Sequence, residues 1–206
     1  MYIPKHFEEN DRKKLVEFMK EYNFATLVNT AKKRYWATHL PFLIFEEGDN
    51  IILRAHIAKA NPQWTNFKKS EEVLVIFHQP HSYISPSLYE NKVSVPTWNY
   101  IAVHAYGVPE ILPSVEQRID LLQETFKVFE AKYKLQWDTL PEDYKNDLLS
   151  GIVAFEIKVT NLEGKFKLSQ NRTEEDRERI IAHLSANDEK VRYDIAKFMS
   201  EIKGAK

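Results

Sequence analysis

Alternation of apolar and polar positions is the dominant pattern of this 206-residue chain, and it predicts many short β-strands. The alternation is strictest at 152–159, where Val153 and Phe155 would share one face of a strand. Between 78 and 96 the pattern breaks down, and three prolines with several serines predict a long ordered loop. The other predicted strands cover 24–30, 35–40, 42–45, 51–57, 73–77, 98–108 and 164–168.

Helical spacing of apolar residues occurs in three regions. Residues 11–22 predict a short helix with Asp11 as its N-cap. Residues 114–134 predict the clearest helix, because apolar side chains recur every three or four positions, and we interpret this stripe as packing against a sheet. The C-terminal part predicts two helices at 173–184 and 188–203, with Thr173 and Asn187 as candidate N-caps.

Together these elements predict an α+β protein built on a closed or partly closed antiparallel barrel, with helices outside it. Hydrophobic residues make up 43% of the chain and aromatic residues 13%, which is enough for a substantial core. Neither a regular βαβ alternation nor a Gly-x-Gly-x-x-Gly motif occurs, so a Rossmann domain is not expected.

Composition argues against several classes of function. The formal net charge of −1 argues against a protein that binds DNA through its overall charge. The chain has no cysteine, which excludes disulfides, thiolate catalysis and cysteine-ligated zinc or iron–sulfur clusters. The start of the chain lacks the pattern of a signal peptide, and no apolar run approaches the ~20 residues that span a bilayer. We therefore expect a cytoplasmic protein without a membrane partner.

A candidate anion site lies where the predicted strand 51–57 runs into a probable helix. Arg54 and His56 are two residues apart and would share one face of the strand. Lys59 and Asn61 follow, beside the start of the helix, where backbone amides favour an anion. The pattern is typical of a phosphate-binding site, although a solvated strand end would show the same residues.

A second candidate face lies on the predicted strand 98–108. Trp98, Tyr100 and His104 are spaced evenly, so two aromatic rings and an imidazole would share one side. Such a face could stack against a flat ring, and it could equally belong to the core of the sheet.

A row of donors follows near the end of the strands. Lys165 and Lys167 share one face of their strand, next to Gln170 and Arg172. Together they could hold an anion, whereas lysines on an edge strand also deter aggregation.

The seven histidines predict no metal site. His78 and His81 form the one close pair, and Pro80 between them prevents a helical arrangement. No carboxylate pattern accompanies them. The Gly-x-Ser-x-Gly motif of covalent hydrolases is also absent from the sequence.

Eight segments in order along the chain together resemble the PaiB family, whose members are FMN-binding proteins described as negative transcriptional regulators. The segments are Met1-Tyr-Ile-Pro-Lys-His-Phe7, Phe24-Ala-Thr-Leu-Val28, His39-Leu-Pro-Phe42, His56-Ile-Ala-Lys-Ala-Asn-Pro-Gln-Trp64, Tyr83-Ile-Ser-Pro86, Pro96-Thr-Trp-Asn-Tyr100, Val103-His-Ala-Tyr-Gly107 and Lys165-Phe-Lys-Leu-Ser-Gln-Asn-Arg172. Three positions depart from the family's pattern. Asn23 stands where Pro is usual and Gln79 where Gly is common, while Leu88 replaces a frequent Trp and so removes a candidate stacking surface.

The resemblance implies a split β-barrel like that of pyridoxamine-phosphate oxidases, within a domain at 1–170, and a C-terminal helical pair at 171–206 packed on it. It also implies a homodimer with FMN at each subunit interface. The phosphate would lie near the strand end and the following helix, and the partner subunit would contribute aromatic and polar groups. The expected cofactor contacts are Arg54, His56, Lys59, Asn61 and Gln63, the interface residues Trp98, Asn99 and Tyr100, and also His104, Lys165, Lys167, Gln170 and Arg172.

The resemblance makes negative regulation of transcription the first hypothesis, although direct DNA binding has little support from charge. The alternative is a flavin-dependent oxidoreductase, such as an NAD(P)H:flavin reductase or an oxidase, because this fold supports such chemistry elsewhere. A third hypothesis is a barrel adapted to haem, with a histidine as axial ligand.

Overall fold

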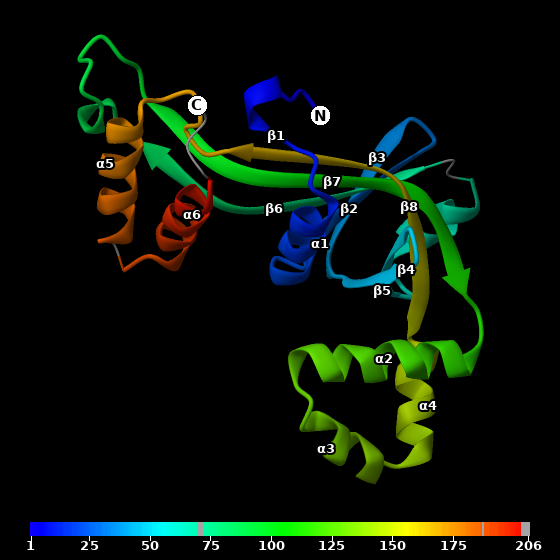
Figure 1. Ribbon diagram of the computed structural model, residues 1–206. Coiled ribbons are helices and arrows are strands. Elements are labelled where there is room, and N and C mark those ends of the chain that lie inside the picture. Colours follow the sequence, from blue (N-terminus) through cyan, green and yellow to red (C-terminus); the bar gives the residue numbers. More distant parts are fainter. Residues whose placement is uncertain (70–71, 187, 203–206) are drawn as a thin grey trace. The chain divides into compact units, whose positions relative to one another are not determined.

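The computed structural model describes residues 1–69, 72–186 and 188–202, and its chain divides into two compact units. Unit 1 consists of Met1–Leu15, His78–His104 and Glu163–Lys206, and unit 2 of Val16–Phe77 and Ala105–Leu162. Three long strands, visible in Figure 1, have residues in both units: β6 (Val73–Ile84), β7 (Thr97–Leu112) and β8 (Ile152–Lys167). The division into domains at residue 170 stays a prediction.

Unit 2 is an antiparallel sheet in the order β3-β2-β6-β7-β8-β5-β4. Its further strands are β2 (Phe24–Ala31), β3 (Arg34–Pro41), β4 (Leu43–Glu47) and β5 (Asn50–Ala58). The hairpin β2–β3 and the hairpin β4–β5 lie where the alternating pattern predicted them. Because β3 also contacts β5, the sheet curves back on itself, as expected for a partly closed barrel.

Aromatic rings fill the core of unit 2. Phe42 lies 6.0 Å from Phe77 and 6.3 Å from Phe155, measured between ring centroids, and both pairs are edge-to-face. Phe67, from the 3₁₀ helix η2 (Pro62–Lys69), packs 5.0 Å from Phe155. Since all four side chains are buried, this cluster fixes η2 against the sheet directly after the end of β5.

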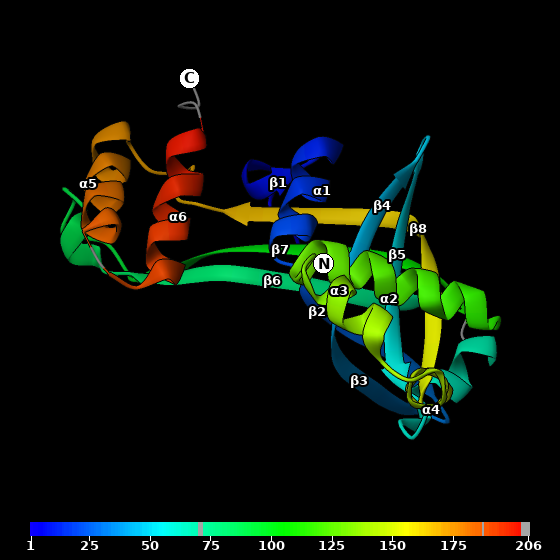
Figure 2. The same ribbon diagram turned by 90° about the horizontal axis from the view of Figure 1, so that it is seen from below.

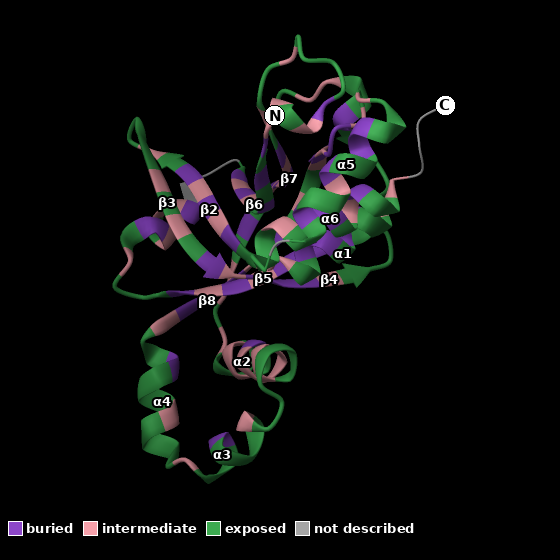
Figure 3. Cartoon of the chain, turned by 90° about the vertical axis from the view of Figure 1, so that its left-hand side faces the viewer, coloured by how far each residue is buried: buried purple, intermediate pink, exposed green. Residues whose placement is uncertain are grey.

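The helices of unit 2 pack beside this sheet. Helix α2 (Val115–Phe129) begins with a capping box between Ser114 and Gln117, and its Leu121 packs with Leu43 and Ala154. The predicted end at residue 134 is wrong, because α2 ends at Phe129 and a separate helix, α3 (Tyr133–Thr139), follows. The ring of Phe126 on α2 lies 5.3 Å from that of Trp137 on α3, measured between centroids. Helices α3 and α4 (Glu142–Ser150) are mostly exposed, as Figure 3 shows.

In unit 1 the strand order is β6-β7-β8, and the short β1 (Glu8–Glu9) pairs with β8. The other 3₁₀ helices, η1 (Lys5–Phe7) and η3 (Pro86–Leu88), also belong to unit 1, and α1 (Arg12–Glu21) begins there after its cap Asp11. The Asp11 carboxylate accepts hydrogen bonds from the amides of Lys13 and Lys14, which confirms the predicted cap.

The C-terminal helices of unit 1, α5 (Glu174–Ser185) and α6 (Lys190–Glu201), lie side by side in Figures 1 and 2. Thr173 caps α5 by accepting a hydrogen bond from the amide of Asp176, as predicted. Arg177 ties the pair together, because its guanidinium donates to the carbonyl oxygens of Met199 and Ile202. The other predicted cap, Asn187, lies outside the described residues.

The predicted loop at 78–96 is wrong in its first part, because β6 continues to Ile84. Burial alternates here: Pro80 and Ser82 are buried, whereas His81 and Tyr83 are exposed. The buried face thus holds a proline and a serine, so the sequence shows no apolar alternation although the backbone is extended.

The break predicted between two strands at 160–163 is also wrong, because β8 runs without interruption to Lys167. Gly164 lies within this continuous strand, opposite Glu9, where β1 pairs with β8. A Cβ atom at Gly164 would lie 2.7 Å from the carbonyl oxygen of Glu9 and 2.3 Å from a methyl group of Leu15. The glycine therefore marks a close backbone approach within the strand.

Candidate functional site

The segment from the end of β5 into η2 contains the predicted phosphate-binding site, and two hydrogen bonds hold its backbone in place. The amide of Lys59 donates to the carbonyl oxygen of Gly151 at 2.8 Å. The carbonyl oxygen of Lys59 accepts from the indole of Trp64 at 2.9 Å. The Lys59 side chain is exposed, and within the described parts of the chain no ion pair is formed by its ammonium.

Gln63 holds this segment against the sheet. Its amide nitrogen lies 3.2 Å from the carbonyl oxygen of Leu27 and 3.1 Å from the Asn29 side chain, and its oxygen accepts from the hydroxyl of Thr38. Asn61 donates to the same hydroxyl at 2.9 Å and accepts from the amide of Gln63. The side chains of Asn61 and Gln63, both predicted to contact the cofactor, are thus engaged in shaping the turn.

His56 lies on β5 opposite Ala154 of β8 and is half-buried. Burial lowers the pKa of its imidazole below the ordinary value. The ring is therefore neutral near pH 7 and can donate one N–H hydrogen bond to a ligand.

Arg54 shares β5 with His56, but its charge is already compensated. Its Nε donates to Glu156 at 2.9 Å, and one of its terminal nitrogens donates to Glu47 at 3.3 Å. The guanidinium also lies 4.9 Å above the ring of Phe45. Two of its five N–H donors are thus directed at carboxylates, which compensate the charge that a phosphate would need.

Beside Arg54 lies a cavity of about 340 Å³. Acidic side chains predominate among its charged lining, and apolar residues complete its wall. The lining consists of Phe45, Arg54, Glu110, Leu112, Gln117, Asp120, Leu121, Glu124 and Glu156. Its charge does not suit an anion.

The other predicted contacts lie in unit 1. Lys165 is buried, and its Nζ donates to the carbonyl oxygen of Tyr2 and lies 5.3 Å from the centroid of the Tyr100 ring. Lys167 donates to the hydroxyl of Thr97 and to the carbonyl oxygen of Trp98. Burial, and then the neighbouring charges of Lys165 and Arg172, lower the pKa of Lys167.

An aromatic row runs along β6 and β7 in unit 1. Trp98 is 52% exposed and lies within 6 Å of both His81 and Tyr83, measured between ring centroids. His78 stacks on His81 at 5.8 Å and meets Tyr100 edge-on at 6.0 Å. His81 and Tyr83 were not among the predicted contact residues. The buried positions Pro80 and Ser82 are not apolar enough to reveal that these two residues share the exposed face of a strand.

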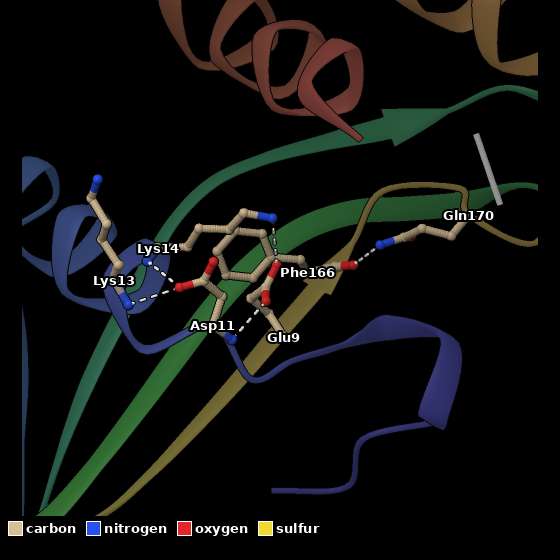
Figure 4. A network of polar contacts seen from close by, with 6 residues as sticks. All are labelled: Glu9, Asp11, Lys13, Lys14, Phe166 and Gln170. Atoms are coloured by element: carbon tan, nitrogen blue, oxygen red, sulfur yellow. Dashed lines mark hydrogen bonds and ion pairs between the residues drawn. The ribbon is translucent and has the colours of Figure 1, made fainter. Parts of the chain in front are cut away.

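Asn99 and Gln170 serve the structure of unit 1. Asn99 is fully buried and exchanges hydrogen bonds with Ser169. Gln170 accepts from the amide of Leu168 and donates to the carbonyl oxygen of Phe166, as Figure 4 shows for the latter bond. Both side chains thus hold the end of β8, which carries Lys165 and Lys167.

Arg172 and His104 complete the predicted set. The guanidinium of Arg172 lies 4.0 Å above the ring of Tyr89, which is buried. His104 is half-buried, and desolvation lowers the pKa of its imidazole. Among the described residues no three histidines, aspartates or glutamates gather as metal ligands, and no helix is both long and apolar enough to cross a membrane.

Known proteins resemble this chain over most of its length. The sequence profile of a family described as "Putative FMN-binding domain" matches residues 1–161. Protease synthase and sporulation protein PAI 2 of Bacillus subtilis (strain 168) is 37% identical over 98% of this chain and 97% of that protein. The uncharacterized protein AN0679 of Emericella nidulans is 33% identical over 71% of this chain and 73% of its own length.

Two solved structures share the fold at low sequence identity. The flavocytochrome Anf3 from Azotobacter vinelandii superposes with a TM-score of 0.62 at 13% identity, covering 85% of this chain and 77% of that one. The FAD and heme binding protein from Mycobacterium smegmatis gives 0.60 at 12% identity, covering 78% and 73%. The expected fold, an α+β split barrel of the flavin-binding type, is confirmed. The chain belongs to the PaiB family of FMN-binding-domain proteins.

Proposed function

We propose that this protein binds FMN and holds the cofactor's phosphate at the turn between β5 and η2. The observation that carries the proposal is the exposed Lys59 ammonium, which has no ion-pair partner in the described residues and projects from a backbone fixed by Gly151 and Trp64. Because the backbone of Lys59 is already fixed, only its side chain has to be ordered when it binds a phosphate, which limits the entropic cost.

His56 supplies a second contact in this proposal. Its neutral imidazole donates one N–H to a phosphate oxygen, and its half-buried position limits competition from water. The backbone amides of Lys59, Asn61 and Gln63 already donate hydrogen bonds within unit 2. In this proposal the phosphate is therefore bound by side chains. Bound FMN would supply the capacity to take up and release electrons, and the protein would supply position and charge.

The proposal includes a homodimer with the flavin at the subunit interface, supported by membership of the PaiB family. Among Trp98, Asn99 and Tyr100, the predicted contributions of the partner, Trp98 alone has a largely exposed ring. Light scattering during size-exclusion chromatography gives the oligomeric state, and a monomer at micromolar concentration contradicts this part.

A negative regulatory role in transcription completes the proposal and rests on the same family membership. With a net charge of −1, any direct DNA contact must come from a local basic surface. A sequence-specific mobility shift that weakens with salt supports direct binding. Oxidation of NADPH at a rate that depends on bound flavin would instead favour the oxidoreductase alternative. A cytoplasmic location stays a prediction.

The test is the visible flavin spectrum of the purified chain after it has been mixed with FMN and desalted. We expect the wild type to retain FMN, and Lys59→Ala to weaken FMN binding at least about tenfold, since it removes a charge-assisted contact. Arg54→Met should change FMN affinity less than about threefold, because Glu156 and Glu47 already hold Arg54.

Lys158→Ala is the matched control, because Lys158 is an exposed lysine of unit 2 on β8. A wild-type chain that retains no FMN sinks the proposal. Retention that depends on Arg54 but not on Lys59 would move the phosphate away from the β5–η2 turn.

A further inference from the structure

Unit 1 gathers three cations that form no ion pair with a carboxylate of the described residues. Lys165 and Lys167 lie two residues apart on β8, and burial together with the charges of Lys165 and Arg172 lowers the pKa of Lys167. Lys165 is only 9% exposed. Buried positive charge without a counter-ion is costly, so proteins keep such clusters where an anion binds.

The nearby carboxylates are engaged elsewhere. Asp176 is held by Arg179 and by the amide of Glu90, and it lies beyond ion-pair distance of Arg172. Hydrogen bonds from Glu90 and Arg179 lower the pKa of Asp176, and the charge of Arg172 still contributes to this shift. Glu9 accepts from Lys14, as Figure 4 shows. The charge that stays available to a ligand is therefore chiefly that of Lys165 and Lys167.

Neutral groups hold the three cations in place. Lys165 lies between the rings of Tyr2 and Tyr100, at 5.8 and 5.3 Å from their centroids, and Arg172 lies over Tyr89. Lys167 donates to Thr97 and to the carbonyl oxygen of Trp98. These contacts position the side chains without neutralising them, which is the arrangement of a preformed anion site.

The cluster adjoins a flat-ring surface in the same unit. The residue whose carbonyl oxygen accepts from Lys167 is Trp98, and its exposed ring contacts Tyr83 edge-on at 5.9 Å. Tyr83 is itself 50% exposed. A ligand that joins a planar ring to an anionic group would satisfy both features.

One FMN brings one phosphate, whereas the chain offers two separate sets of candidate anion-binding groups: Lys59 with the neutral His56 in unit 2, and the cluster in unit 1. We propose that Lys165, Lys167 and Arg172 form a second anion site, which takes the phosphate of a nucleotide other than FMN. That phosphate would come from a nicotinamide nucleotide that binds in unit 1 in addition to FMN.

Calorimetric titration of the full chain tests this site with three probes: FMN, inorganic phosphate and, on FMN-saturated protein, NADPH. We expect wild-type protein to bind NADPH more tightly than inorganic phosphate. Lys167→Gln should weaken that binding at least about tenfold while FMN affinity stays within about twofold. Lys158→Gln on the same strand is the matched control and should change neither.

NADPH binding that depends on Lys167 supports the second anion site. An equal loss of FMN affinity in Lys167→Gln overturns the proposal, because the cluster then serves the FMN phosphate. Absence of binding by NADPH and inorganic phosphate alike also overturns it. Unfolding curves of each variant, and Arg172→Gln as a second substitution, guard against misfolding.

Discussion

Arg54 in unit 2 and Lys167 in unit 1 are both half-buried cations on strands, yet their surroundings are opposite. Two carboxylates, those of Glu156 and Glu47, each accept a hydrogen bond from the guanidinium of Arg54. Lys167 donates only to neutral oxygens and has two further cations as neighbours. A cation's residue type and spacing therefore say little about whether its charge is available to a ligand. The partners across the sheet decide that.

The comparison predicts opposite signs for removing charge in the two units, and the largest effect concerns Arg54. Glu156→Gln should lower the free energy of unfolding by about 1–2 kcal/mol, because it leaves Arg54 half-buried with one weaker partner. Chemical denaturation with urea measures the change. The exposed carboxylate of Glu47 provides the control, and Glu47→Gln should cost less than about 0.5 kcal/mol.

A double-mutant cycle sharpens this prediction. Arg54→Met combined with Glu156→Leu should recover most of the loss, since an apolar pair of similar volume replaces the ion pair. If Glu156→Gln is neutral and the double variant is no more stable than the singles, Glu156 does not compensate Arg54. Arg54 would then regain its place among the candidate phosphate contacts.

The second prediction concerns Lys167. Lys167→Met should leave the free energy of unfolding unchanged or raise it by about 0.5–1 kcal/mol, because it removes a desolvated charge that repels Lys165 and Arg172. The same denaturation experiment measures it, with Lys158→Met as the exposed control on β8. A loss above about 1 kcal/mol would show that the hydrogen bonds to Thr97 and Trp98 outweigh the repulsion.

Much of the fold could be predicted from local patterns. The β2–β3 hairpin, the cap at Asp11 and the start of α2 each depend on residues close in sequence, and all three are confirmed. The pattern failed where the reason is not local. Residues 78–84 read as a loop because Pro80 and Ser82 occupy the buried face of β6.

The candidate site was predictable in composition but not in electrostatics. The sequence correctly placed Arg54 and His56 on one strand, ahead of the turn that carries Lys59. It gave no sign that Glu156, 102 residues further on, pairs with Arg54 across β5 and β8. Nor could it show that the side chain of Gln63 is hydrogen-bonded to β2 and β3. Cross-strand partners depend on register, which spacing alone does not reveal.

The smallest effect, and the most specific, is the pH dependence of stability. The pKa of Lys167 in the folded chain is lowered below its ordinary value of 10.5, chiefly by burial. In the alkaline window between the lowered pKa and 10.5, the unfolded chain therefore binds more protons, and the free energy of unfolding rises with pH. Other groups titrate there too, so the measured quantity is the difference between wild type and Lys167→Met, followed by urea denaturation across that window. The difference should shrink when an anion occupies the cluster, because a bound phosphate raises the pKa of Lys167 again. A difference that is flat with pH would mean that Lys167 is not desolvated, and the contrast with Arg54 would then rest on partners alone.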